Sequence, residues 1–410
     1  MDFKKNMNLK KGLKKEHLKY NNRSLILKNI FKNGPMSKKK LAEAIHLTPA
    51  ALTLICNDML KQEMLLEVGE KEEKRAGRKE ILLDINYNYA YVFGLDIKKD
   101  KTILALSNIG ASILDKIEIL NPNYSDDCYF ELIKKSVNKL LSKNKIDKEK
   151  ILGLGISMIG IVNPKKGISV NSNGIWNRDV HLKKKLEDKL SIPVTADNDT
   201  RNLAIAHMYQ NKSFKDMIFL KYGPQIGSTI IRKGEIFLGK YFYAGEMGHS
   251  ILEDGKDYCP ICKRRGCLES SINFDRIISK IKKSYIENKN DFPILKKIIC
   301  DNIEKIDIDT IFKAIELGAV KETELIKDSA KKLAITLLNS MSLIDPEMVI
   351  LYGKAFDCKK FNEHFQNVIL DFSLNDEFKK IKKSSFDQNM EIYGSLYLAI
   401  EKFFYIYGKL

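Results

Sequence analysis

The sequence lacks any apolar run long enough to cross a lipid bilayer, and its first residues, Met-Asp-Phe-Lys-Lys, do not resemble a signal peptide. Only seven of the 410 residues are cysteines, and Cys56, Cys128, Cys300 and Cys358 lie far apart, without a disulfide framework. These absences predict a cytoplasmic protein with no membrane partner, whose cysteines are reduced thiols or metal ligands. The hydrophobic content of 44% is sufficient for the cores of two or three domains.

Positive charge is concentrated near the N-terminus. The net charge of the chain is +17, and residues 1–80 contain 19 basic and 10 acidic residues, which contribute +9. Lysine is abundant along the whole sequence, so compositional bias explains part of this excess. The uneven distribution favours a nucleic-acid partner for the N-terminal segment.

The N-terminal segment divides into a tail and a helical domain. Residues 1–20 are lysine-rich with little apolar periodicity and are expected to form a basic tail. Residues 21–86 are expected to form a winged helix-turn-helix domain, whose first helix ends at Asn33-Gly34-Pro35. Ser37 can cap the second helix, and Thr48 with Pro49 can begin the third helix after a short turn.

The third helix of this segment has the features of a DNA-recognition helix. Leu52, Ile55 and Met59 follow a helical period, and small or polar residues occupy the opposite face. Two predicted strands, residues 64–68 and 81–85, enclose a charged loop that resembles a wing. The residues expected to contact DNA are Ser37, Lys38, Thr48, Pro49, Ala50, Thr53, Asn57, Arg75 and Arg78. The alternative is a three-helix packing or dimerisation module.

A cluster of metal-ligand residue types lies near the middle of the chain. The expected ligands, at H-x9-C-x2-C-x4-C spacing, are His249, Cys259, Cys262 and Cys267. Zinc prefers four tetrahedral nitrogen and sulfur ligands, so this spacing predicts one Zn²⁺ site. Three unrelated buried cysteines and a core histidine are the alternative. Glu246 and Glu269 flank the cluster, which suggests that the metal shapes a polar pocket.

The rest of the chain has an α/β pattern with two sets of strands. The expected strands are residues 91–97, 102–107, 112–119, 151–157 and 194–196 in the first set, and 217–222, 228–232, 235–237 and 348–352 in the second. Strand triplets with crossover helices predict two related lobes and a cleft between them. The first lobe is expected at 87–200, completed by a C-terminal helix at about 390–410, and the second at 201–389, with the zinc segment at 245–270.

Two motifs together resemble the ROK family (repressors, open reading frames and sugar kinases). They are Gly245-Glu246-Met247-Gly248-His249 with its cysteines, and Asn198-Asp199 after a strand that begins with Pro-Val. With the N-terminal domain, the chain resembles the repressor branch, typified by xylose and N-acetylglucosamine repressors. The resemblance implies an actin-like, hexokinase-like two-lobed fold and a homodimer or higher homo-oligomer. The family usually separates its first two cysteines by one residue, whereas two residues separate Cys259 and Cys262 here.

The resemblance also implies a sugar-binding pocket. The residues that match the family's sugar contacts are Asn173, Asn198, Asp199, Glu246, His249 and Glu269. Hydroxyl groups both donate and accept hydrogen bonds, so a sugar site needs several acceptors and a few donors, as this set offers. Surface polarity or helix capping is the alternative for each residue alone, and it is the expected role of Asp197 and Thr200.

The family's kinase motifs are altered in this chain. Its phosphate motif Asp-x-Gly-Gly-Thr corresponds to Asp96-Ile97-Lys98-Lys99-Asp100, and Gly-x-Gly-Ile-Gly corresponds to Gly223-Pro224-Gln225-Ile226-Gly227. Without the glycines, the backbone cannot approach a phosphate closely, so we expect no enzyme activity, although Asp199 matches the catalytic base.

The sequence therefore predicts a repressor of sugar-metabolism genes that binds operator DNA and loses affinity when a sugar closes the cleft. Xylose, glucose and N-acetylated hexosamines all fit as effectors. An ATP-dependent sugar kinase with a fused DNA-binding domain is the first alternative. A constitutive regulator with a vestigial pocket is the second.

Overall fold

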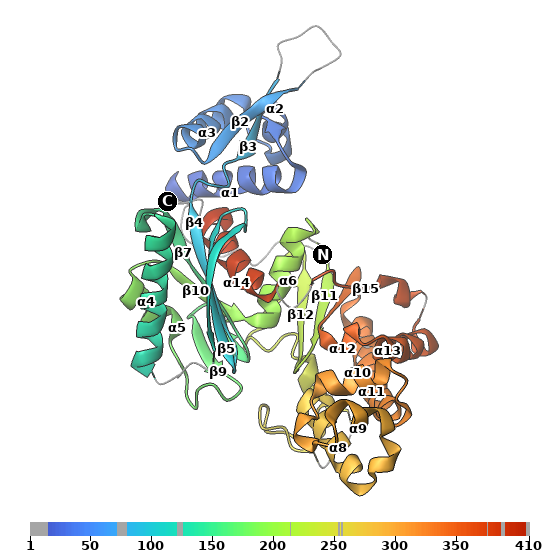
Figure 1. Cartoon of the computed structure of the whole chain (residues 1–410). Coiled ribbons are helices and arrows are strands. Elements are labelled where there is room, and N and C mark those ends of the chain that lie inside the picture. The colour runs from blue at the N-terminus through green and yellow to red at the C-terminus, as the bar shows by residue number, and fades with distance from the viewer. Residues whose placement is uncertain are drawn as a thin grey trace.

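The computed structural model describes residues 15–71, 80–120, 126–213, 215–252, 255, 257–374, 376–386 and 390–406. A small N-terminal module precedes two larger lobes, each built on its own five-stranded sheet (Figure 1). In the described part of the chain, no helix has the length and apolar character needed to span a membrane.

The N-terminal module combines three helices with a three-stranded antiparallel sheet. The helices are α1 (Lys15–Asn33), α2 (Lys38–Ile45) and α3 (Pro49–Lys61). The strands, in the order β1-β3-β2, are β1 (Met36–Ser37), β3 (Glu80–Ile85) and β2 (Leu65–Lys71). Helix α1 begins at Lys15 and so includes residues that the sequence pattern assigned to a basic tail.

Local capping explains where α2 and α3 begin. The Ser37 hydroxyl accepts a hydrogen bond from the Lys40 N–H at 3.4 Å, and the Thr48 hydroxyl accepts one from the Ala51 N–H at 3.3 Å. Each bond satisfies a backbone donor that has no partner within its helix. His46 adopts the left-handed conformation (φ 55°) and ends α2, as expected for the short turn before α3. Both predicted caps are confirmed.

The first lobe is a mixed sheet with helices on both faces. Its strands, in the order β10-β7-β4-β5-β6, are β10 (Val194–Asn198), β7 (Ile151–Met158), β4 (Tyr91–Ile97), β5 (Lys101–Asn108) and β6 (Ile113–Leu120). Strands β4, β5 and β6 are antiparallel, whereas β7 and β10 run parallel to β4. Helices α4 (Asp126–Asn144) and α5 (Leu182–Leu190) contribute to its core. The hairpin of β8 (Ile161–Asn163) and β9 (Ile168–Asn171) extends from this lobe.

The second lobe repeats the same strand topology. Its strands, in the order β15-β14-β11-β12-β13, are β15 (Ile381–Lys383), β14 (Met348–Tyr352), β11 (Met217–Tyr222), β12 (Ile226–Arg232) and β13 (Glu235–Ile236). The helices beside it are α7 (Leu268–Ile272), α8 (Phe274–Glu287), α9 (Pro293–Ile299), α10 (Ile308–Glu316), α11 (Val320–Ile344), α12 (Lys354–Asp357) and α13 (Lys359–Phe372). The repetition confirms the two-lobed α/β architecture predicted from the strand triplets.

Two helices connect the lobes to the N-terminal module. Helix α6 (Asp199–Gln210) packs against α14 (Glu391–Ala399), which also packs on β4 and β7 and continues as the π-helical segment η7 (Ile400–Ile406). The ring of Phe31 in α1 lies 5.2 Å from that of Tyr209 and 5.4 Å from that of Tyr405. Helix α1 therefore rests on the C-terminal ends of α6 and of the α14–η7 helix (Figure 1).

Candidate functional site

The residues matched to sugar contacts lie together on the wall of one cavity of about 280 Å³ between the lobes. They are Asn173, Asn198, Asp199, Glu246, His249 and Glu269. They come from separate parts of the chain, including the end of β10, the start of α6, the turn η2 (Met247–His249) and the short helix α7. The fold therefore places within one site residues that the sequence separates widely.

The junction of β10 and α6 presents polar side chains to this cavity. The Asn198 side-chain oxygen accepts hydrogen bonds from the N–H groups of Thr200 (2.9 Å) and Arg201 (3.1 Å), which caps α6. Its amide donates to the Gly160 carbonyl at 2.8 Å and to the Asp199 carboxylate at 3.1 Å. Asp199 is the first residue of α6, where the helix dipole favours a carboxylate.

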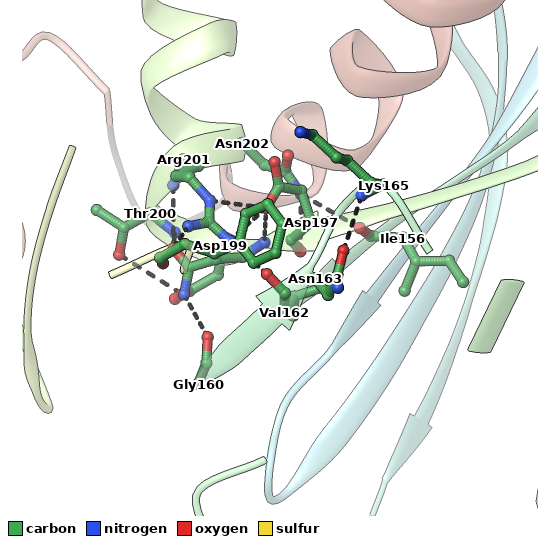
Figure 2. Close-up of polar contacts among 12 residues, drawn as sticks. Ile156, Gly160, Val162, Asn163, Lys165, Asp197, Asp199, Thr200, Arg201 and Asn202 are labelled. Atoms are coloured by element: carbon green, nitrogen blue, oxygen red, sulfur yellow. Dashed lines mark hydrogen bonds and ion pairs between the residues drawn. The ribbon is translucent and has the colours of Figure 1, made fainter. Parts of the chain in front are cut away.

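A buried ion pair supports this junction. The Arg201 Nε donates to the Asp197 carboxylate at 2.7 Å, and other guanidinium nitrogens donate to the carbonyls of Val162 (2.9 Å) and Phe242 (3.2 Å) (Figure 2). Asp197 and Arg201 are both almost fully buried. The expectation that Asp197 is only a surface or capping residue is therefore wrong. Its i,i+4 spacing from Arg201 was the available signal.

Two buried glutamates provide hydrogen-bond acceptors. Burial raises the pKa of Glu269 to about 7, although the Ile226 N–H donates to one of its oxygens at 2.9 Å. The other oxygen is buried and makes no hydrogen bond of good geometry in the described structure, although the nearby Asn273 side chain lowers the pKa of Glu269. Burial also raises the pKa of Glu246 to about 7, against the opposing effect of Arg201. Hydroxyl donors of a ligand would compensate both carboxylates for their lost hydration.

A chain of alternating charges extends from Asp199 into a neighbouring cavity of about 450 Å³. The Lys221 ammonium lies 2.7 Å from the Asp199 carboxylate and 3.5 Å from that of Glu391. Lys98 forms ion pairs with Glu391 and, at 3.4 Å, with Asp96. Burial alone would lower the pKa of Lys221, but the two carboxylates outweigh it and raise this pKa. Sequence reasoning missed Lys221 and Glu391, although a lysine within the apolar strand β11 was a visible signal.

The altered kinase motifs have defined positions around these cavities. Lys98 is engaged with two carboxylates, and the Gln225 side chain accepts a hydrogen bond from the Asn173 amide at 2.8 Å. Lys99 lines both cavities, and the described structure gives it no ion pair. Side chains therefore occupy positions where glycines would let backbone approach a phosphate.

The four predicted metal ligands converge. Their ligand atoms lie within 4.8 Å of one another, and the His249 Nδ1 is 3.9 Å from the sulfurs of both Cys259 and Cys267. The sulfurs of Cys262 and Cys267 are also 3.9 Å apart. Tetrahedral zinc requires ligand separations of about 3.6–3.8 Å, so the donor set fits such an ion. Because Nδ1 faces the cysteines, the other ring nitrogen of His249 is available to the cavity that this residue lines.

The residues expected to contact DNA differ in exposure. Ser37 is only 2% exposed, and its hydroxyl caps α2, whereas Thr48 is exposed although its hydroxyl accepts the Ala51 N–H that it caps. Pro49, Ala50 and Asn57 are exposed on α3, and Thr53 is half-buried. The Lys38 ammonium donates to the Asn57 side-chain oxygen at 2.8 Å, which joins α2 to α3. Arg75 and Arg78 lie outside the described residues.

Comparisons with known proteins agree with this architecture. The ROK family profile matches residues 92–402. The chain is 29% identical to a xylose repressor of Caldicellulosiruptor bescii over 89% of this chain and 91% of that protein.

Two solved structures show the same fold. A ROK family transcriptional regulator, described as a homolog of the Escherichia coli MLC protein, superimposes with a TM-score of 0.81 at 20% identity. That alignment covers 95% of this chain and 97% of the regulator. A ROK glucokinase from Streptomyces griseus, in complex with glucose and AMPPNP, covers 75% of this chain and 98% of its own, with a TM-score of 0.64 at 20% identity. The lobes have the expected actin-like fold, and the chain belongs to the ROK family.

Proposed function

We propose that this protein is a transcriptional repressor of sugar-metabolism genes, whose affinity for operator DNA falls when a sugar binds between the lobes. The observation that carries the proposal is the single cavity that gathers every residue matched to sugar contacts, in a chain that also has an N-terminal helical module. The named C. bescii relative supports the same function.

The N-terminal module acts in this proposal as a winged helix-turn-helix domain. Helices α2 and α3 are joined by a tight turn, and strands β2 and β3 form a hairpin suited to be the wing. The exposed face of α3 combines small and polar residues with the apolar Leu54, Lys38 of α2 contacts Asn57 beside it, and this face can enter a major groove. Arg75 and Arg78, which lie between β2 and β3 in the sequence, would contact the DNA backbone or minor groove. A homodimer or larger homo-oligomer would bind two half-sites.

The cavity between the lobes acts as the effector site. Asp199, Glu246 and Glu269 offer acceptors for sugar hydroxyls, and Asn198 supports them by capping α6. A Zn²⁺ ion held by His249 and the three cysteines would fix the imidazole and the surrounding loop. The metal has a structural role here, because the four protein ligands complete its coordination.

Helices α6 and α14 provide a physical link between sugar and DNA. Helix α6 begins with Asp199, in the chain of alternating charges, and its Tyr209 contacts Phe31 of α1. Helix α14 begins with Glu391, in the same chain of charges, and Tyr405 in its η7 continuation also contacts Phe31. A sugar that draws Asp199 away from Lys221 would move the helices on which the DNA-binding module rests. Sugar binding and DNA binding would then shift the position of the same helices, α6 and α14, so each would change the affinity for the other.

Sugar phosphorylation is not proposed. In this structure Asp199 is paired with Lys221, and Lys98 forms ion pairs with two carboxylates. Gln225 stands where the family's phosphate-binding motif has a glycine. ATP turnover that depends on a sugar and disappears in Asp199→Asn would contradict this part of the proposal.

DNA binding is tested with the full chain and a duplex selected from a random library. Fluorescence anisotropy should show a dissociation constant that rises steeply with salt. Lys38→Ala with Asn57→Ala should weaken binding, whereas Lys139→Ala, at an exposed position of α4, should not. Failure to select any duplex would contradict the proposed function.

A further inference from the structure

The effector cavity continues into an outer cavity of about 560 Å³ beside the metal cluster. Asn173, Gln225 and Glu269 line both cavities. The two cavities therefore adjoin at these side chains, two of which, Asn173 and Gln225, are hydrogen-bonded to each other. A ligand that extends past these boundary side chains from the inner cavity would enter the outer one.

At the boundary between the cavities, two side-chain oxygen atoms that could accept a hydrogen bond have no well-placed donor among the described residues. Asn173 has φ 50°, its amide donates to Gln225, and its own side-chain oxygen is buried without a partner in the described structure. Glu269 is 2% exposed, and one of its carboxylate oxygens is buried and also makes no hydrogen bond of good geometry in the described structure. Unmade hydrogen bonds of buried groups are costly, so a hydroxylated ligand at this boundary would be favoured if a small side-chain movement exposed either oxygen to it.

The outer cavity combines an aromatic ring with polar groups. Tyr258 is 53% exposed although it is a large aromatic residue, and a backbone bridge to Arg265 holds it within the metal-binding segment. Asp275 and Ser279 line the same space, and Arg276 there is paired with Asp257. A pyranose ring presents an apolar face and a hydroxylated edge, and this cavity offers a partner for each.

We propose that the effector is a disaccharide or a longer glycan, with one ring in the inner cavity and the next ring against Tyr258. The inference rests on the proposed function, because it names the class of sugar that the effector site takes. Asn173 and Glu269 accept hydroxyl donors near the glycosidic linkage. The outer ring adds contact area that a monosaccharide does not reach.

Calorimetric titration of the zinc-loaded full chain tests the inference. The probes are xylose, glucose and N-acetylglucosamine, each compared with its disaccharides xylobiose, cellobiose, maltose and chitobiose. At least one disaccharide should bind about tenfold more tightly than its own monosaccharide, which corresponds to about 1.4 kcal/mol.

Two variants locate the second ring. Ser279→Tyr fills the outer cavity and Tyr258→Ala removes the aromatic surface, so each should abolish the tenfold preference while leaving the monosaccharide affinity within about twofold. Tyr241→Ala, at a 68% exposed tyrosine that lines neither cavity, should leave the preference intact. Zinc content, measured for each variant, shows whether the metal-binding segment remains folded.

The outcomes separate this inference from the proposed function. If a monosaccharide binds and no disaccharide binds more tightly, the inference is wrong and the sugar-binding function stands. If the preference survives in Ser279→Tyr with zinc retained, the second ring lies elsewhere and the inference is also wrong. If no sugar of either kind binds, the proposed effector site itself fails.

Discussion

Replacing Lys221 with methionine should strongly destabilise the protein, because the buried Lys221 pairs with two largely buried carboxylates, each 15% exposed. Burial by itself would raise the pKa of Glu391, but Lys221 and Lys98 lower it from 4.5 to about 2. A shift of this size corresponds to about 3 kcal/mol of stability, to which Lys221 and Lys98 both contribute. Asp199, 2.7 Å from the ammonium, loses its ion pair as well. We therefore expect Lys221→Met to cost about 3–5 kcal/mol, as for other broken buried pairs.

Urea unfolding, followed by the fluorescence of Trp176 in the first lobe, measures this loss. Lys101→Met is the matched control, because Lys101 forms an exposed pair with Glu118 at 3.0 Å and should cost less than about 1 kcal/mol. Because the Glu391 pKa is depressed, its contribution is present above pH 4.5 and is lost as the pH falls towards 2. The difference between wild type and Lys221→Met should therefore shrink over that range. Equal losses for the two variants at pH 7 would refute the reasoning.

Three further predictions concern the metal, the DNA and the pH. Cys262→Ser should lower the zinc content measured by mass spectrometry and abolish the sugar response, while operator binding persists. Leu54, 73% exposed on α3, should contact a thymine methyl: replacing that thymine by uracil should cost wild type about 1 kcal/mol in an anisotropy assay and cost Leu54→Ala nothing. Because burial raises the pKa values of Glu246 and Glu269 to about 7, these carboxyls lose their stabilising protons as the pH rises through 7. Sugar hydroxyls can compensate the resulting carboxylates, so the thermal shift caused by sugar should be larger at pH 8 than at pH 6, and equal shifts would exclude their role.

Local signals allowed part of the structure to be predicted from the sequence. The caps at Ser37 and Thr48 depend on residues three positions apart, and the metal ligands lie within one short segment. Strand periodicity was sufficient for the two-lobed architecture, because each strand was apolar and bounded by turns. The family resemblance then connected Asn173 with Glu269, which no local pattern could bring together.

Long-range electrostatics and helix packing were not visible in the sequence. Lys221 and Glu391 are 170 positions apart, and neither has a local partner that marks the ion pair. Helix α1 starts earlier than its sequence suggests, because its first turns carry few apolar residues. The contact of Phe31 with Tyr209 and Tyr405 joins three distant segments, and only the folded chain reveals it.

Operator affinity in the presence of sugar provides the most direct test of the proposed repressor. The duplex selected for the full chain is titrated by anisotropy with and without a saturating concentration of the sugar that binds most tightly. The sugar should raise the operator dissociation constant about tenfold or more, and saturating operator should raise the sugar dissociation constant by the same factor. A sugar that binds in the cavity yet leaves operator affinity unchanged would show that this protein is not a sugar-responsive repressor.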